Sequence, residues 1–210
     1  MLLQLDEDDL STMRRLGLII AILPILLASA APNAHSQETS ASSEYLIKAG
    51  FIYNFASLVQ WPAATFPQPD SPIVIAILGQ DHFGTTLDRV LQGKKVNGRS
   101  FVIKRLKSVS ELLKSVADLK DCHILFVSSS EMSRLAEAIQ IVKGIPVLTI
   151  GETPDFAKNG GMINLILEDN RVRFEVNVEA AKQADLNISS RLLALARIVS
   201  QAPADGRKAE

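Results

Sequence analysis

The stretch from Gly160 to Asn177 is the sequence feature that most constrains how this chain folds. Two runs of alternating polar and apolar residues flank Asp169-Asn170, and both residue types tolerate the positive φ of a two-residue hairpin turn. That turn sets the register on the apolar face as Ile163–Val176, Leu165–Phe174 and Leu167–Val172. On the other face it gives Glu168–Arg171, Ile166–Arg173, Asn164–Glu175 and Met162–Asn177. The sequence therefore predicts a β-hairpin with one face in a core and a mixed face at or near the surface.

Composition permits one compact domain and argues against nucleic-acid binding. The chain has 210 residues, of which 47% are hydrophobic, and its formal net charge is −1. No basic stripe is obvious in the sequence, so there is no electrostatic reason to expect a nucleic-acid partner. Cys122 is the single cysteine, which excludes an intrachain disulfide. We expect it to be buried, because a free cysteine behaves as a small hydrophobe.

The N-terminal region is typical of a secretory signal. Met13-Arg14-Arg15 precedes an apolar run from 16 to 27, which is shorter than the roughly 20 residues of a membrane span. Small residues suited to signal cleavage follow at Ala34-His35-Ser36, or earlier at Ala28-Ser29-Ala30. The acidic residues before Met13 do not belong to such a signal, which makes Met13 the expected start. An uncleaved membrane anchor is the alternative, and either form places the domain outside the cytoplasm.

The remaining chain divides into a short N-terminus, one domain and a tail. We assign 1–36 to the extension and signal peptide, 37–43 to a flexible mature N-terminus, 44–199 to the domain and 200–210 to a flexible tail. The expected helices are 44–59 capped by Ser43, 85–91, 109–116, 131–142, 179–184 and 190–199. The expected strands before the hairpin are 73–78, 101–106, 122–127 and 146–150. This order predicts an α/β fold with a mainly parallel sheet, flanking helices, an antiparallel hairpin and a C-terminal helix.

No constellation of residues indicates catalysis. Cys122 and His123 are neighbours on an expected strand, so their side chains point to opposite faces and cannot form a nucleophile–base pair. No cluster has convincing metal-ligand spacing. The serines at 128–130 are explained most simply by helix capping, and the alternative is an anion held by their backbone donors. We therefore expect a protein that is not an enzyme and that uses no cofactor or metal.

Several short motifs resemble the YfiR-like family of periplasmic proteins. In order along the chain they are Trp61-Pro62, Gly79, Cys122-His123, Leu148-Thr149, Phe156-Ala157, Gly160-Gly161, Phe174-Glu175-Val176-Asn177 and Ser189-Ser190-Arg191-Leu192-Leu193. The resemblance implies a regulator that binds and restrains the periplasmic domain of an inner-membrane diguanylate cyclase. It thereby implies control of cyclic-di-GMP signalling and biofilm formation, sequestration by an outer-membrane lipoprotein, and a homodimer. The disulfides of the best-studied relatives do not transfer, because Cys122 is alone.

Two sets of residues are candidates for binding. The polar face of the hairpin and the start of the last helix are candidates for one exposed partner surface, comprising Arg173, Glu175, Asn177, Asn187 and Arg191. The alternative is that Arg173 and Glu175 form a solvated or structural pair. A periplasmic small-ligand module is the rival function, with Phe51, Tyr53 and Trp61 lining a pocket. Core packing is the alternative for these aromatic residues.

Overall fold

The computed structural model describes residues 34–114 and 121–201, with side-chain surroundings from residue 42 onward. Most of the expected signal segment and most of the tail lie outside these residues. The folded unit begins at Ala41. The first described helix, α2, spans Ala34–Leu58. The predicted N-cap at Ser43 is therefore wrong, and residues 37–43, expected to be flexible, are helical.

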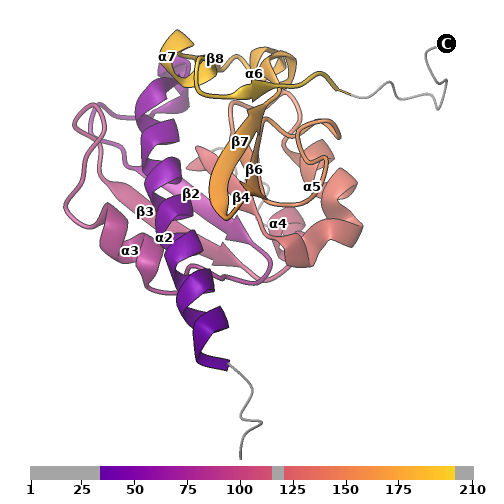
Figure 1. The fold of residues 1–210 in the computed structure, drawn as a ribbon. Coiled ribbons are helices and arrows are strands. Elements are labelled where there is room, and N and C mark those ends of the chain that lie inside the picture. Colours follow the sequence, from indigo (N-terminus) through magenta and orange to yellow (C-terminus); the bar gives the residue numbers. More distant parts are fainter. Residues whose placement is uncertain (1–33, 115–120, 202–210) are drawn as a thin grey trace, which may run out of the picture. The chain divides into compact units, whose positions relative to one another are not determined.

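A seven-stranded sheet in the order β3-β2-β4-β5-β6-β7-β9 forms the centre of this unit (Figure 1). Its strands are β2 (Ile73–Leu78), β3 (Phe101–Leu106), β4 (Ile124–Val127), β5 (Leu148–Gly151), β6 (Ile163–Glu168), β7 (Arg171–Val176) and β9 (Arg197–Ile198). Strands β2 to β6 run parallel, β7 is antiparallel to β6, and β9 is parallel to β7. A separate antiparallel pair joins β1 (Val59–Gln60) to β8 (Asn187–Ile188). The predicted α/β class with a mainly parallel sheet is confirmed.

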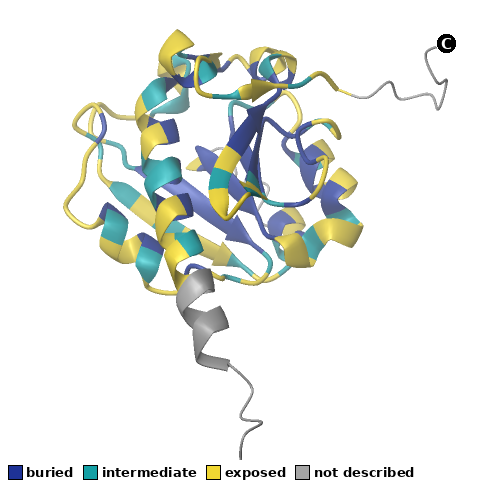
Figure 2. Ribbon diagram, in the orientation of Figure 1, coloured by how far each residue is buried: buried dark blue, intermediate teal, exposed yellow. Residues whose placement is uncertain are grey.

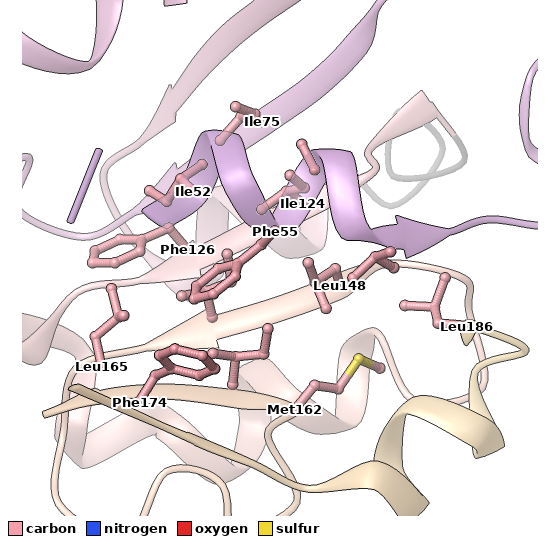
Figure 3. Packing of buried hydrophobic residues seen from close by; sticks show 14 of the residues in the cluster. Ile52, Phe55, Ile75, Ile124, Phe126, Leu148, Met162, Leu165, Phe174 and Leu186 are labelled. Carbon is pink, nitrogen blue, oxygen red and sulfur yellow. The ribbon is translucent and has the colours of Figure 1, made fainter. Parts of the chain in front are cut away.

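Helices cover both faces of the sheet. The described helices after α2 are η1 (Ala63–Thr65), α3 (Thr86–Leu91), α4 (Val109–Lys114), η3 (Ser129–Arg134), α5 (Leu135–Ile141), α6 (Val178–Gln183) and α7 (Ser190–Leu193). Strand β2 is continuously apolar because it is buried on both faces. Ile75 and Ile77 join the cluster beneath α2 and α3, whereas Ala76 and Leu78 join the cluster beneath α4 and α5. Figure 3 shows Phe55 of α2 packed with Phe126 and Phe174 in the first cluster.

The hairpin has the register that its alternation predicts. All six pairs from Ile163–Val176 to Glu168–Arg171 match, and Asp169 and Asn170 have φ values of 50° and 57°. Burial follows a different pattern, because it depends on position along the hairpin as well as on its face (Figure 2). Near the base even the polar side chains are buried, whereas Leu167 near the tip is 55% exposed. The expected division into one core face and one surface face is therefore wrong.

Phe156 explains the glycines at the base of the hairpin. Its ring is fully buried, and a Cβ added at Gly151 or Gly161 would collide with it. Gly160 has a φ of 99°, which supplies the sharp turn into β6. Both features place the start of β6 directly against β5.

The C-terminal helix differs from the prediction. Instead of a helix over 190–199, α7 ends at Leu193 and the chain then forms β9, which pairs with Glu175 and Val176 of β7. Helical spacing of apolar residues favoured a longer helix, but pairing with the hairpin edge overrides that local preference. The predicted helix 131–142 is likewise divided into η3 and α5.

Candidate binding sites

The carboxyl ends of β2, β4 and β5 are the first place to look for a site. Strand β3 follows β2 on one side of it and β4 lies on the other, so β2 and β4 flank a switch in strand order. Ligands of open α/β sheets bind in the crevice at such a switch. The loops concerned begin at Gly79 after β2, at Ser128 after β4 and at Glu152 after β5.

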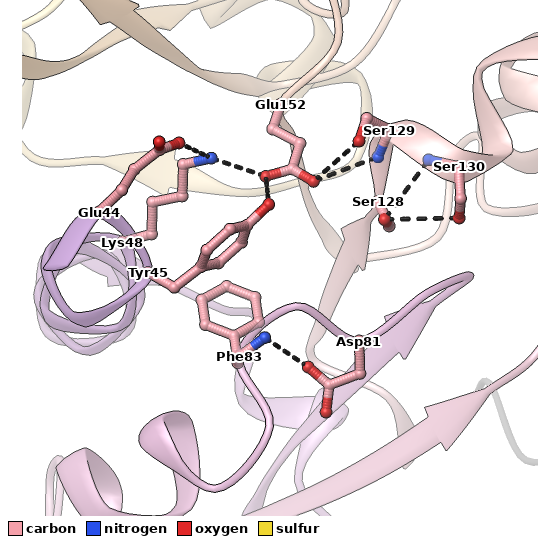
Figure 4. A network of polar contacts seen from close by, with 9 residues as sticks. All are labelled: Glu44, Tyr45, Lys48, Asp81, Phe83, Ser128, Ser129, Ser130 and Glu152. Atoms are coloured by element: carbon pink, nitrogen blue, oxygen red, sulfur yellow. Dashed lines mark hydrogen bonds and ion pairs between the residues drawn. The ribbon is translucent and has the colours of Figure 1, made fainter. Parts of the chain in front are cut away.

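A network of polar side chains occupies this position (Figure 4). Lys48 of α2 is only 5% exposed, and its Nζ lies 2.7 Å from a Glu152 carboxylate oxygen and 2.6 Å from Glu44. The Tyr45 hydroxyl donates to the same Glu152 oxygen at 2.9 Å, and the Ser129 amide donates to the other at 3.2 Å. Burial first, and then the Glu152 carboxylate, raise the pKa of the Tyr45 phenol, so Tyr45 acts here as a neutral donor.

This network links α2 to the sheet. Its charged groups are paired and hydrogen-bonded to one another, which is how buried charges are tolerated. The burial of Lys48 in a largely apolar helix is explained by its ion pair with Glu152, which lies 104 positions away along the chain. Sequence reasoning could not find this pair, because nothing in the local pattern of either residue indicates the other.

Cys122 and His123 lie on opposite sides of the sheet, as predicted. Cys122 is buried in the cluster with α4 and α5, and burial raises the pKa of its thiol to about 12. His123 stacks on Phe66 with ring centroids 4.4 Å apart, and its Nδ1 accepts a hydrogen bond from the Val74 amide. Burial first, and then the nearby Arg99, lower the pKa of His123 to about 4, so the ring is neutral near pH 7. Within the described ranges, no three acidic, histidine or cysteine side chains converge as metal ligands would.

The five candidate partner-binding residues do not form one exposed surface. Arg173, Asn187 and Arg191 are exposed. Glu175 is 8% exposed and accepts a hydrogen bond from Asn164 Nδ2 at 3.2 Å. Asn177 is fully buried. The expectation that Glu175 and Asn177 are exposed is therefore wrong.

Asn177 holds two elements together. Its Oδ1 accepts from the Ala180 amide at 3.0 Å and so caps α6, while its Nδ2 donates to the Ala157 carbonyl at 2.8 Å. A side chain that uses both ends of its amide inside the protein has no polar group left for a partner. Its position in the sequence motif is explained by this packing role.

The three candidate pocket aromatics lie in different places. Phe51 packs on Phe174 beside the hairpin, with ring centroids 5.4 Å apart. Tyr53 contacts Phe101 of β3 at 6.0 Å, and Trp61 donates to the His123 carbonyl at 3.2 Å. Phe51 and Trp61 line separate grooves of about 450 Å³ and 420 Å³. The expectation that the three residues line a common pocket is wrong.

The groove beside the hairpin exposes apolar side chains that sequence reasoning missed. We call it the hairpin groove, and it is lined by Phe51, Ile166, Val172, Arg173, Phe174, Leu195, Ala196 and Arg197. Leu195 is 73% exposed, and Ile198 just beyond it is 53% exposed. The helical spacing of apolar residues over 190–199 predicted that Leu195 is buried, and this prediction is wrong.

Arginines surround this groove. Arg197 donates to Glu168 at 2.7 Å, and this contact holds the pKa of the Glu168 carboxyl below its ordinary value. Arg173 lies 3.2 Å from the same carboxylate, and Arg171 and Arg191 are exposed nearby in sequence. Arg197 also lies 3.7 Å from the Glu175 carboxylate, so Arg173 and Arg197 are both paired with acidic groups and the groove is edged by ion pairs.

Comparison with known proteins identifies a family, but the similar solved structures share little sequence identity with this chain. The model of the YfiR/HmsC-like family matches residues 45–197. No curated protein matches the sequence. A conserved domain protein from Vibrio cholerae has a TM-score of 0.50 at 9% identity, covering 71% of this chain and 59% of that one. Within residues 34–114 and 121–201, no helix is long and apolar enough to cross a membrane.

Two further structures are similar at lower scores. One is the ABC domain from Streptococcus pneumonia in complex with L-Trp, with a TM-score of 0.49 and 10% identity, covering 61% of this chain and 55% of that chain. The other is CD0873, a substrate binding protein from Clostridium difficile, with a TM-score of 0.45 and 12% identity, covering 62% and 55%. The matches span little more than half the length of these structures. The family model covers most of the chain, and the protein belongs to the YfiR/HmsC-like family.

Proposed function

We propose that this protein is a periplasmic regulator, without enzymatic activity, that binds and restrains the periplasmic domain of an inner-membrane diguanylate cyclase. It thereby controls cyclic-di-GMP signalling and biofilm formation, and an outer-membrane lipoprotein relieves the restraint by sequestering it. The observation that carries this proposal is the family match over residues 45–197. Export by the N-terminal signal and a homodimeric state belong to the same proposal, and their support is the family resemblance.

The hairpin groove is the surface that we assign to the membrane partner. It combines exposed apolar side chains, above all Leu195, with an arginine rim. Exposed apolar groups edged by charged side chains suit a protein partner with an apolar anchor and a polar rim. Arg173 remains a candidate contact on this surface. Asn187 and Arg191, which are exposed on β8 and α7, remain candidates outside the lining of this groove.

Recovery of the partner from the cell envelope tests this function. The full chain, tagged at its C-terminus and expressed from its own gene, is captured from detergent-solubilised envelopes, and the bound proteins are identified by mass spectrometry. We expect a membrane protein that carries a diguanylate cyclase domain. Capture that repeatedly yields no such protein would contradict the proposal.

A matched pair of variants tests the surface. Leu195→Ser removes the exposed side chain of the groove, whereas Leu113→Ser removes an exposed leucine of α4. We expect the first variant to recover at least about fivefold less partner than the second, because apolar anchors at the centre of an interface carry much of the binding energy. Equal recovery from both variants would move the partner surface elsewhere on the protein.

A small-ligand module is the second candidate function, and one observation favours it. The groove of about 420 Å³ beside Trp61 is also lined by Phe66 and Arg99, which is a suitable lining for a small aromatic anion. Trp61 is the only tryptophan, so its fluorescence reports on this groove alone. A saturable change in that fluorescence on addition of a periplasmic extract of small molecules would favour this function, and an unchanged spectrum would remove it.

A further inference from the structure

Positive charge is concentrated at the edge of the sheet opposite to the hairpin. The segment 89–107 carries seven basic residues and no acidic residue: Arg89, Lys94, Lys95, Arg99, Lys104, Arg105 and Lys107. A net charge of −1 hides this segregation, because acidic residues elsewhere balance it. The sequence-based expectation that the chain has no basic stripe is therefore wrong for this segment. Arg105 is paired with Asp81 and Asp88, whereas Arg89, Lys95 and Lys104 form no ion pair within the described part of the chain.

Strand β3 has an open edge along this basic segment. Among the described residues it pairs only with β2. The carbonyls of Ser100 and Leu106 accept hydrogen bonds from the amides of Ile73, the first residue of β2, and Gly79, the residue after β2. Because backbone groups alternate in direction along a strand, the polar groups of Phe101, Ile103 and Arg105 face away from β2. A second strand would find an unused set of donors and acceptors here.

A groove runs beside this edge. It has a volume of about 460 Å³ and lies between α3, the loop that follows α3, and β3. Leu91, Phe101 and Ile103 give it apolar walls. On its rim Arg89, Lys94 and Lys95 outnumber the single acidic residue, Asp88, whose carboxylate is paired with Arg105 at 2.6 Å. Lys94 is held over the Tyr53 ring at 4.5 Å, which positions one rim cation.

The three features together fit one kind of partner. We infer that the β3 edge binds an extended acidic polypeptide segment, which adds to β3 as a further strand. Backbone hydrogen bonds with Phe101, Ile103 and Arg105 supply affinity, alternate side chains enter the groove, and carboxylates meet the basic rim. A flat anionic membrane would meet the charges but would use neither the strand edge nor the groove. This site does not rest on the proposed function, because β3 and the hairpin groove lie at opposite edges of the sheet.

The test uses the full exported chain and a defined probe. The probe is a fluorescein-labelled peptide of about ten residues in which glutamate alternates with valine, and binding is followed by fluorescence anisotropy. We expect saturable binding that weakens as the salt concentration rises from about 50 to about 500 mM. The same peptide with alternate amides N-methylated keeps its charge but loses donors, and we expect it to bind at least about tenfold more weakly.

Two variants with the same change in net charge complete the test. Arg89→Glu with Lys95→Glu reverses exposed charges at the groove, and we expect it to weaken binding at least about tenfold. Lys143→Glu with Lys182→Glu reverses exposed charges elsewhere, and we expect binding within about twofold of the unchanged protein. Three results would overturn the inference: no binding of the peptide, equal binding of its N-methylated form, or binding to phosphatidylglycerol vesicles in place of the peptide.

Discussion

The switch point of the sheet and the hairpin groove are built in opposite ways. At the carboxyl ends of β4 and β5, charged groups are buried: the side chains of Lys48 and Glu152 are 6% and 3% exposed. Beside the hairpin, apolar groups are exposed, and Leu195 is the extreme case. The switch point, where open α/β sheets bind ligands, is thus occupied by the protein's own side chains. The hairpin groove, which is not such a position, exposes apolar surface.

This difference separates internal structure from available surface. A buried ion pair offsets its cost of desolvation only when its geometry is good and its remaining polar atoms are hydrogen-bonded. Tyr45 and Ser129 donate the hydrogen bonds that satisfy the Glu152 carboxylate. Such a network fixes α2 on the sheet and has little left to offer a ligand. The groove gains nothing in the isolated protein from exposing leucine, so its apolar surface is available to a partner.

Breaking the buried pair should have the largest effect. Lys48→Met leaves the Glu152 carboxylate buried without its cation, and we expect a loss of about 3–5 kcal/mol in the free energy of unfolding at pH 7. Urea unfolding at pH 7 followed by circular dichroism measures this loss.

The double variant Lys48→Met with Glu152→Leu is the matched control. It removes both charges, and we expect it to recover more than half of the lost stability, because apolar groups can replace a buried ion pair at little cost. A double variant as unstable as Lys48→Met alone would mean that packing around Lys48, and not its charge, supports α2.

His123 is a buried polar group that forms no ion pair with the residues the structure describes, and it should make stability depend on pH. Its folded pKa of about 4 lies below the ordinary value of 6.5, so the unfolded state binds the proton more readily between these values. Its contribution is complete above pH 6.5 and is lost as the pH falls toward 4, by up to about 3 kcal/mol.

Replacement of His123 isolates this contribution. His123→Asn keeps an acceptor close to the position of Nδ1, which accepts the hydrogen bond from the Val74 amide. The asparagine side chain cannot be protonated in this pH range. Thermal unfolding from pH 7 to 4 should therefore give a shallower slope for this variant than for the unchanged protein. Identical slopes would assign the acid sensitivity to the carboxylates alone.

Asn177 tests whether the buried polar residues at the hairpin base are structural. Asn177→Ala removes the cap of α6 and leaves the Ala157 carbonyl without its donor, and we expect a loss of about 2 kcal/mol in the free energy of unfolding. Asn177→Asp keeps the cap acceptor but puts a carboxylate oxygen against the Ala157 carbonyl in a fully buried position, so we expect it to be at least as destabilising. If Asn177→Ala leaves the free energy of unfolding unchanged, Asn177 has no structural role and is again a candidate partner contact.

Local patterns predicted the fold well where strands and turns carry their own signals. The hairpin register followed from its alternation and from Asp169-Asn170, and the bounds of β2 and β3 were as expected. Contacts between distant residues escaped prediction, because only the folded chain brings them together. Lys48 meets Glu152 across the sheet, and Arg197 pairs with Glu175 where helical spacing had favoured a longer α7. The hairpin groove depends on that last pairing, so its exposed Leu195 could not be foreseen.

The smallest expected effect is at the groove itself, where two leucines of one segment form a matched pair. Leu192 is 2% exposed and Leu195 is 73% exposed. Leu192→Ala should cost about 2–4 kcal/mol in the free energy of unfolding, because it opens a cavity in the core. Leu195→Ala should change stability by less than about 0.5 kcal/mol, because its side chain is already in water. If Leu195→Ala proves strongly destabilising in urea unfolding of the isolated protein, Leu195 is packed in solution, and the hairpin groove is not a free surface for a partner.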